Sequence, residues 1–323
     1  MKISFEIMKQ ETKKLKLEKP NFSGNVFSEI ECVMSDELTK EIPLVNVFVG
    51  HITDKKLIKD VILDLNRLLP VLELQHLKRV HKNKVLICLF EENMEKDIML
   101  SLKQLGFNTS LLAPNLEILQ VLKYAPKTRA QFLRGNIYWP MNFHEDKYVE
   151  RLLANTVFSS QEIKLHEKWM GAAVEAAKKS KIKSGTAIVD PVKNILIAVG
   201  SDARDEHPLK HSIMVAIDLV AHAQGGGAWE AHCADFHNKK IVKNFESKDD
   251  GPYLCTGYYI YTTHEPCIMC SMALVHSRVK RIFYGIPSSN GALGTLLKIH
   301  CLKNLNHHYE VFKGLLKGEV SVL

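Results

Sequence analysis

The stretch THEPCIMCSMALVHSRVKRIFYG, Thr263–Gly285, carries the most informative pattern in this chain. Two cysteines, Cys267 and Cys270, stand one helical turn apart directly after Pro266, and an apolar run follows them. Pro266 fixes the angle at which the chain enters the turn, and the spacing predicts a helix that begins at the cysteines. The free N–H groups at a helix start lower the pKa of a thiol, and the thiolate is the form that binds metal. The stretch therefore predicts a helix whose first turn offers two metal-binding thiolates.

A second stretch, HSIMVAIDLVAH (His211–His222), supplies a third ligand. Two cysteines in C-x-x-C spacing are by themselves equally compatible with buried core thiols or with part of a four-cysteine structural site. A histidine at the start of a second helix favours the metal, because one histidine and two cysteines form a zinc set that leaves the fourth position open. We predict a zinc ion bound by His211, Cys267 and Cys270.

The position two residues after His211 departs from a known pattern. Zinc nucleobase deaminases combine H-x-E with P-C-x-x-C, and the glutamate is their general acid and base. In this chain Ile213 occupies the glutamate position. An isoleucine accepts no proton, so we predict no catalytic residue here and expect Glu265, beside the cysteine turn, to support the ligands from outside. The alternative is that Glu265 or Glu206 serves as the acid, which requires hydrogen-bonding reach of the metal-bound water.

The amino-acid composition favours a soluble, non-secreted protein. The chain has 323 residues, 46% of them hydrophobic, which suits a soluble protein of two domains. We find neither a signal peptide nor an apolar run of about 18 residues, so we expect no membrane span. Seven cysteines scattered over a long chain favour a reducing compartment, the cytosol, the nucleus or both. The net charge of +7 suits an anionic partner such as nucleic acid, although many basic proteins bind none.

The first third of the chain alternates between strand and helix patterns. An apolar helical stripe begins after Thr53, which we expect to cap it, and ends at Pro70. A second helix is predicted from Asn93 to Gly106. The order βαβαβ predicts a ferredoxin-like or related open sheet that reaches to about residue 120, with strands at 45–50, 84–90 and 116–122.

The second half begins with a clear helix start. Ser159 and Glu162 form a capping box before a long amphipathic helix. Two β-rich runs, 186–190 and 194–200, are joined by turn residues and predict a hairpin.

We divide the chain near residue 155 into two domains. Residues 1–155 form a smaller N-terminal α+β domain with a connector, and residues 156–323 form the zinc-binding domain. The glycine-rich polar stretch 225–251 is expected to be a mobile insertion.

Two stretches of the N-terminal half are rich in basic residues. HLKRVHKNK (His76–Lys84) contains no acid, and KYAPKTRAQFLRGNIYW (Lys123–Trp139) interleaves basic residues with aromatic ones. Lysine and arginine bind phosphates and aromatic faces stack on unpaired bases, so the pattern suits RNA; a solvated charged face with core aromatics fits the composition equally well. The candidate RNA-binding residues are Lys78, Arg79, Lys82, Lys84, Lys127, Arg129 and Arg134, accompanied by Tyr124, Phe132, Tyr138 and Trp139.

The cysteine stretch, with GALGT (Gly291–Thr295) soon after it, resembles the tRNA adenosine deaminases of the cytidine-deaminase superfamily. The aliphatic residue at the glutamate position, the long N-terminal extension and the tail NHHYEVFKGLL (306–316) resemble the catalytically silent subunit within that family. The resemblance is firm over residues 185–317 and weaker before them.

This resemblance implies a fold, partners and a role. The fold is α/β, with a C-terminal cytidine-deaminase-like αβα three-layer domain that holds Zn²⁺ through His211, Cys267 and Cys270. The role is that of a non-catalytic, tRNA-binding subunit, with Ile213 in place of the acid. It forms a heterodimer with a separate catalytic subunit that converts the wobble adenosine of tRNA anticodons to inosine, in the nucleus and cytoplasm.

Two alternatives stay open at this point. One is an active zinc-dependent nucleobase deaminase that uses another acid, and the other is a zinc-stabilised RNA-binding protein without a deaminase partner. The apolar C-terminal tail KGEVSVL (317–323) adds a further hypothesis, that the tail folds back into the place where the metal-bound water would lie.

Overall fold

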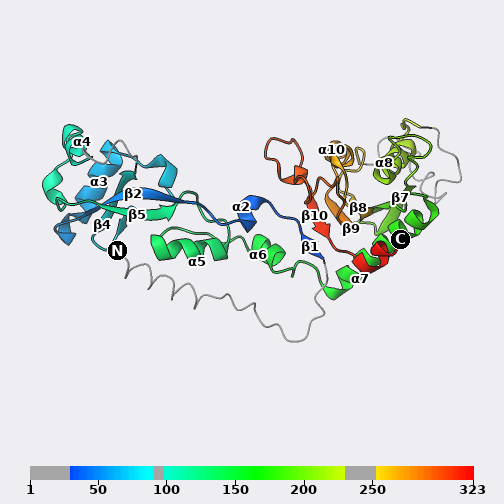
Figure 1. The fold of residues 1–323 in the computed structure, drawn as a ribbon, viewed down its shortest axis with the longest axis horizontal. Coiled ribbons are helices and arrows are strands. Elements are labelled where there is room, and N and C mark those ends of the chain that lie inside the picture. Colours follow the sequence, from blue (N-terminus) through cyan, green and yellow to red (C-terminus); the bar gives the residue numbers. More distant parts are fainter. Residues whose placement is uncertain (1–29, 91–97, 230–251) are drawn as a thin grey trace.

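The computed structural model describes residues 30–90, 98–229 and 252–323, which form two units, each built around one β-sheet (Figure 1). The larger, C-terminal unit has a six-stranded sheet in the order β1-β10-β9-β8-β6-β7. Strand β9 pairs in parallel with β8 on one side and with β10 on the other. The pairings of β1 with β10, of β8 with β6 and of β6 with β7 are antiparallel. The strands are β1 (Glu31–Cys32), β6 (Gly185–Asp190), β7 (Ile195–Ser201), β8 (Tyr259–His264), β9 (Arg281–Ile286) and β10 (Glu310–Lys313).

Helices cover both faces of this sheet. Alternate strand residues point to opposite faces, so Ile260 and Ile282 join one core cluster while Tyr261 and Phe283 join the other. The predicted αβα three-layer fold is confirmed. The first face carries α8 (Ser212–Ala223), α10 (Ile268–His276) and the single turn η6 (Ile299–Cys301). The second face carries α7 (Ser160–Lys179) and α11 (Lys317–Ser321).

The N-terminal unit has the strand order of a ferredoxin-like fold. Its elements follow the sequence βαββαβ, its sheet order is β3-β4-β2-β5, and every pairing is antiparallel. The extra strand β3 was not predicted, because two residues are too few to show a period. The elements are β2 (Leu44–His51), η1 (Lys55–Leu57), α3 (Ile58–Leu68), η2 (Leu72–Leu74), β3 (Val80–His81), β4 (Lys84–Leu89), α4 (Ile98–Gln104), η4 (Thr109–Leu111) and β5 (Glu117–Leu122).

The start of the first helix differs from the prediction. The side chain of Asp54, not Thr53, accepts from the backbone of Lys56 and caps a short 3₁₀ turn that leads into α3. Thr53 instead donates its hydroxyl to the carbonyl of Leu111. The second predicted helix exists as α4, and its expected cap, Asn93, lies outside the described residues.

The predicted local signals of the C-terminal unit are confirmed. Ser159 and Glu162 make the reciprocal bonds of a capping box at the start of α7. Strands β6 and β7 form the hairpin, whose turn ends at Asn194 in the left-handed region (φ 54°). Most of the predicted insertion, residues 230–251, lies outside the described residues.

The predicted division at residue 155 assigns strand β1 to the N-terminal domain, whereas the structure places it in the C-terminal unit. Strand β1 pairs with β10 and so belongs to the C-terminal sheet. Leu152 on α6 (Lys147–Leu153) packs into the C-terminal core as well. The chain therefore crosses between the units twice, first through α2 (Asp36–Thr39) and again between α5 (Arg129–Tyr138) and α6. A two-residue strand at the edge of a distant sheet leaves no signal in composition.

The C-terminal tail lies on the face of the sheet that carries α7. Val320 of α11 packs over Gly285, where a side-chain Cβ would come within 2.7 Å of it. The metal-ligand candidates belong to the opposite face. The hypothesis that the tail fills the metal pocket is therefore wrong.

Among the described residues, no helix is both long and apolar enough to cross a membrane.

Candidate metal centre

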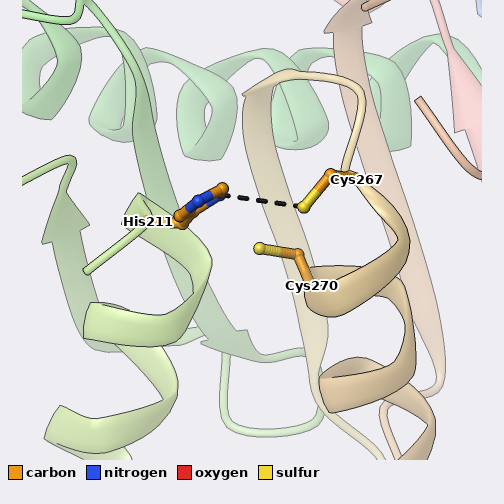
Figure 2. Close-up of side chains that lie close together, drawn as sticks. All are labelled: His211, Cys267 and Cys270. Carbon is orange, nitrogen blue, oxygen red and sulfur yellow. Dashed lines mark hydrogen bonds between the residues drawn. The ribbon is translucent and has the colours of Figure 1, made fainter. Parts of the chain in front are cut away.

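The three predicted ligands come together at the starts of two helices (Figure 2). His211 is the N-cap of α8, Cys267 is the N-cap of α10, and Cys270 lies in the first turn of α10. Helix α8 can begin this close to the sheet because Gly200 on β7 has no side chain. A Cβ there would stand 2.3 Å from the backbone oxygen of Ser212.

The geometry of the triad suits a tetrahedral ion. The candidate ligand atoms of the three residues all lie within 4.8 Å of one another, and Cys267 Sγ is 3.8 Å from His211 Nδ1. Zinc bonds of about 2.0–2.3 Å at tetrahedral angles place neighbouring ligand atoms about 3.5–3.8 Å apart. Small side-chain rotations would bring all three atoms to these distances.

The electrostatics of the triad favour a cation. The thiol of Cys270 donates to Cys267, and this bond, with the backbone N–H groups of Cys270 and Met269 and the nearby His211, lowers the pKa of Cys267 to about 5. Donating its proton to Cys267 and being buried raise the pKa of Cys270. A metal ion would replace the shared proton and hold both sulfurs as thiolates.

Glu265 braces the cysteine turn through a neighbouring loop. Its buried carboxylate accepts from the backbone N–H groups of Ser288, Leu293 and Thr295 and from the Thr295 hydroxyl. The same loop donates from Ala292 N–H to the carbonyl of Pro266, directly before Cys267. Glu265 therefore supports the ligands indirectly, by fixing the loop that holds their turn.

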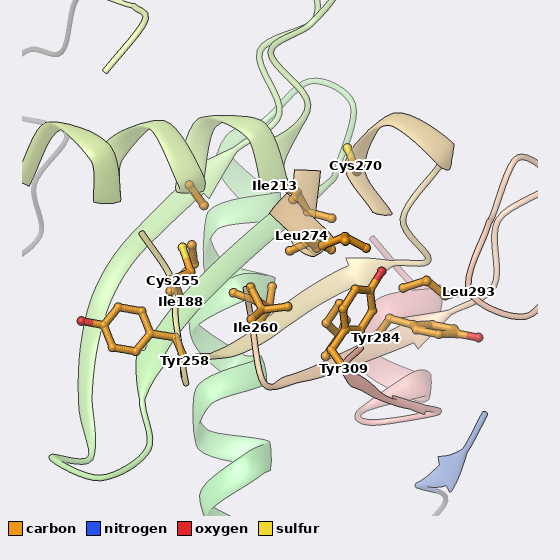
Figure 3. Close-up of a cluster of buried hydrophobic side chains, with 14 of the residues drawn as sticks. Ile188, Ile213, Cys255, Tyr258, Ile260, Cys270, Leu274, Tyr284, Leu293 and Tyr309 are labelled. Carbon is orange, nitrogen blue, oxygen red and sulfur yellow. The ribbon is translucent and has the colours of Figure 1, made fainter. Parts of the chain in front are cut away.

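Ile213 closes the side of the site where a deaminase carries its glutamate. It is 3% exposed and belongs to the apolar cluster of Leu274 and Ile260 on this face of the sheet (Figure 3). Its side chain also lines a cavity of about 280 Å³ beside the triad. This wall of the cavity offers no proton acceptor at position 213.

Two carboxylates line the same cavity, and both are bonded to other groups. Glu265 is held by its loop, as described above. Asp202 is buried, and both of its oxygens accept from Arg204 Nε, at 2.9 and 3.0 Å. The other acid considered from the sequence, Glu206, is exposed and pairs with Lys210.

The pair Asp202 and Arg204 was missed by sequence analysis. The signal that could have found it is the segment SDAR, which begins at the last residue of β7 and precedes the candidate ligand His211. His264 lines the same cavity, and Cys255, outside the triad, is buried in the core.

Comparisons with known proteins match both units. The family model of the cytidine and deoxycytidylate deaminase zinc-binding region matches residues 163–286, and that of the tRNA-specific adenosine deaminase TAD3 N-terminal domain matches residues 45–139. The probable inactive tRNA-specific adenosine deaminase-like protein 3 of Danio rerio is 38% identical over 89% of this chain and 92% of its own length. This chain belongs to the TAD3 family.

Two further relatives agree. The protein of the same description from Homo sapiens is 34% identical over 89% of each chain. The tRNA-specific adenosine deaminase subunit tad3 of Schizosaccharomyces pombe is 29% identical over 74% of this chain and 71% of its own length. The TAD3 match of the N-terminal unit includes both of the predicted basic stretches up to Trp139.

The four basic residues of the stretch His76–Lys84 have different surroundings. Lys78 and Lys82 are exposed, whereas Lys84 bonds to Glu117 at 2.5 Å. Arg79 is partly buried and donates to the carbonyls of Leu69 and Ile87. Leu69 is the C-cap of α3, so Arg79 satisfies a carbonyl at the negative end of that helix. Burial lowers the pKa of Arg79 to about 10.

The second basic stretch lies on and before α5, at the side of the N-terminal unit that leads to α6. Three of its four cations form ion pairs with acids: Lys127 with Glu37, Arg129 with Glu145 and Arg134 with Glu41.

The aromatic residues of this stretch divide between surface and core. Tyr124 and Tyr138 are exposed, whereas Trp139 is buried and donates its indole N–H to the carbonyl of Lys78. Phe132 is partly buried and stacks on Phe143. RNA binding by this surface stays a prediction.

Proposed function

We propose that this chain is the non-catalytic subunit of a heterodimeric tRNA adenosine deaminase that converts the wobble adenosine of tRNA anticodons to inosine. The reaction belongs to a separate deaminase chain that carries the glutamate of H-x-E. The observation that carries the proposal is Ile213, a buried aliphatic residue two positions after a metal-ligand histidine, in a chain of the TAD3 family. The descriptions of two relatives, "probable inactive" for the Danio rerio protein and "subunit" for the Schizosaccharomyces pombe protein, agree with this role.

We propose further that His211, Cys267 and Cys270 hold a zinc ion. Their atom types and spacing fit the metal, and the matching family model describes a zinc-binding region. Bound there, zinc would lower the pKa of a coordinated water to about 7. Deamination also needs a group that moves protons between water and the leaving amine, and Ile213 cannot do so. In this chain the metal then serves chiefly to tie α8 to α10.

The remaining residues of this chain contribute binding and orientation. The exposed lysines of the N-terminal unit, Lys78 and Lys82 among them, would hold tRNA phosphates. A subunit that binds the body of the tRNA presents the anticodon to its partner at a lower entropic cost.

An active deaminase in this chain is the less supported reading. It would need Glu265 or Asp202 to leave the hydrogen bonds that hold them and to turn toward the metal-bound water. The alternative of a zinc-stabilised RNA-binding protein without a deaminase partner does not account for the similarity to deaminase-like relatives over 89% of this chain.

Co-expression tests the proposal. The chain is produced with a deaminase chain that retains H-x-E, and we expect a stable 1:1 complex that forms inosine on tRNA, while this chain alone forms none. Inosine formation by the isolated chain would support the active-deaminase reading. Failure to form any complex with such chains would favour the RNA-binding protein.

A further inference from the structure

Two short helices, α2 and α6, lie in the span between the two units (Figure 1). We propose that they form a double brace that fixes the orientation of the N-terminal unit relative to the metal-binding unit. Gln131, Glu150 and Tyr148 are then positioning residues for a substrate that touches both units. The role in positioning a substrate rests on the proposed function, whereas the two-sided connection of the units is a property of this chain alone.

The first brace is held to the N-terminal unit by a buried glutamine. Gln131 of α5 is 8% exposed, and its side-chain amide donates to the carbonyls of Glu37 and Lys40, each at 2.9 Å. Its carbonyl oxygen accepts from the backbone of Lys127 at 2.9 Å. Two bonds from one buried side chain thus hold the first turn and the C-cap of α2 to the start of α5, and the third, to Lys127, fixes the orientation of that side chain.

The other side of α2 is held to the C-terminal unit. Lys298 donates to the carbonyl of Met34 and to the carboxylate of Asp36, at 2.8 and 2.6 Å. Immediately before them, the carbonyl of Val33 accepts from the buried ring of His300 at 2.7 Å. Glu37 forms ion pairs toward both units at once, with Lys127 of the N-terminal unit and Lys303 of the C-terminal unit.

The second brace, α6, has the same two-sided arrangement. Toward the N-terminal unit, Glu150 accepts from the backbone N–H of Arg129 at 2.7 Å, at the first turn of α5. Toward the C-terminal unit, the Tyr148 hydroxyl donates to Glu310 at 2.6 Å and accepts from Arg281 at 3.1 Å. Arg281 also donates to Glu310, which joins α6 to strands β9 and β10.

Two connections restrain more than one does. A single linker leaves the units free to swing about it, whereas two braces that begin on the same helix, α5, and end at different points of the C-terminal unit oppose that rotation. A substrate that contacts both units then meets them in a fixed arrangement, which raises the effective concentration of the second contact after the first. A short RNA that contacts only one unit makes no second contact, so its affinity does not depend on the orientation of the units.

The test uses a nearly isosteric change, Gln131→Glu, in the full-length chain. Glutamate keeps the oxygen that accepts from Lys127 but places a second acceptor against the two carbonyls of α2. Gln120→Glu, at an exposed position of β5, makes the same charge change away from both braces. Tyr148→Phe removes only the hydroxyl of the second brace, with Tyr253→Phe, at an exposed tyrosine, as its control. Thermal melting verifies that each variant is folded.

Small-angle X-ray scattering of the chain alone decides whether the brace exists. We expect Gln131→Glu to increase the radius of gyration and the maximal dimension, Tyr148→Phe to do so less, and both controls to match the wild type. Unchanged scattering in Gln131→Glu and Tyr148→Phe overturns the proposal, whatever the activity of the complex.

Activity of the complex decides what the brace is for. On whole tRNA we expect Gln131→Glu to raise KM about tenfold with little change in kcat, and on an anticodon stem-loop to leave both constants unchanged. An equal rise in KM on the two substrates, or no rise on either, would overturn the positioning role. A wild-type complex that forms no inosine would contradict the proposed function. The scattering experiment would then still decide whether the two helices restrain the units.

Discussion

The metal triad and the basic stretch His76–Lys84 differ in how their side chains are held. In the triad, residues 56 positions apart, His211 and Cys267, converge with Cys270 on one point. In the basic stretch, adjacent residues diverge: Arg79 turns inward to two carbonyls, while Lys78 is exposed to solvent. Converging groups depend on one another, so the loss of one should disable the others. Diverging groups act separately, and each should have its own effect when it is removed.

The largest effect is expected from Cys267→Ala. It removes one of three ligands, so zinc content should fall from about one ion per chain to almost none. Because metal binding ties α8 to α10, we expect a loss of about 5 kcal/mol in the free energy of unfolding. Metal analysis and denaturant unfolding measure the two quantities. Cys301→Ala, at a partly buried cysteine outside the triad, is the control and should keep its zinc. A Cys267→Ala chain with full zinc content would refute the ligand assignment.

Acid should destabilise the C-terminal unit through two histidines outside the triad. Burial lowers the pKa of His166 to about 4, helped by nearby Arg281, and burial lowers that of His300 to about 4. Both are neutral in the folded chain at pH 5, whereas the unfolded chain, with a pKa of about 6.5, is protonated there. Stability is therefore complete above pH 6.5 and falls as the pH drops toward 4, by about 2 kcal/mol per histidine at pH 5.

His166→Phe separates this effect from acid release of the metal. Unfolding at pH 8 and at pH 5 is compared in the variant and the wild type, and the variant should lose about 2 kcal/mol less between the two values. Equal losses in both chains would show that His166 is not the neutral, buried group described.

Arg79→Ala should destabilise the N-terminal unit without a specific effect on RNA. The change removes two hydrogen bonds to the carbonyls of Leu69 and Ile87, one of them at the end of α3, and we expect a loss of about 2 kcal/mol. Urea unfolding measures it. The neighbouring exposed Lys78 gives the matched control, since Lys78→Ala should change stability by less than about 0.5 kcal/mol. Equal stabilities of the two variants would contradict the inward role of Arg79.

The smallest effect on stability, and the one specific to RNA, is expected from Lys82→Ala. The complex should bind tRNA with a salt dependence whose slope is lower by about one, while its melting temperature stays unchanged. Binding is measured between 50 and 200 mM salt. An unaltered slope for Lys82→Ala and Lys78→Ala together would place the RNA on another surface.

The same contrast explains what the sequence could predict. His211, Cys267 and Cys270 are rare residue types at helix starts, and that pattern allows few geometries, so their convergence was predictable. The αβα layers followed from the resemblance, and the capping box and the β6–β7 hairpin followed from local patterns. The sign of a charge, by contrast, does not reveal whether the side chain turns inward as Arg79 does.

Features that depend on distant partners were not predictable. Strand β1 has two residues and exists only because β10 lies beside it. The bonds of Asp202 to Arg204, and of Glu265 to its loop, depend on how the chain closes around the cavity. The C-terminal tail carried an apolar pattern that fits either face of the sheet, and the contact of Val320 with Gly285 decided between them.

One measurement tests the central claim most directly, that this chain holds the metal but cannot move the proton. Wobble inosine is quantified on whole tRNA with a complex in which the glutamate of H-x-E in the deaminase partner is changed to glutamine and this chain is wild type. We predict no inosine above background, with the zinc content of the complex unchanged. Robust inosine formation by that complex would mean that the cavity beside Ile213 is itself an active site, and would contradict the account.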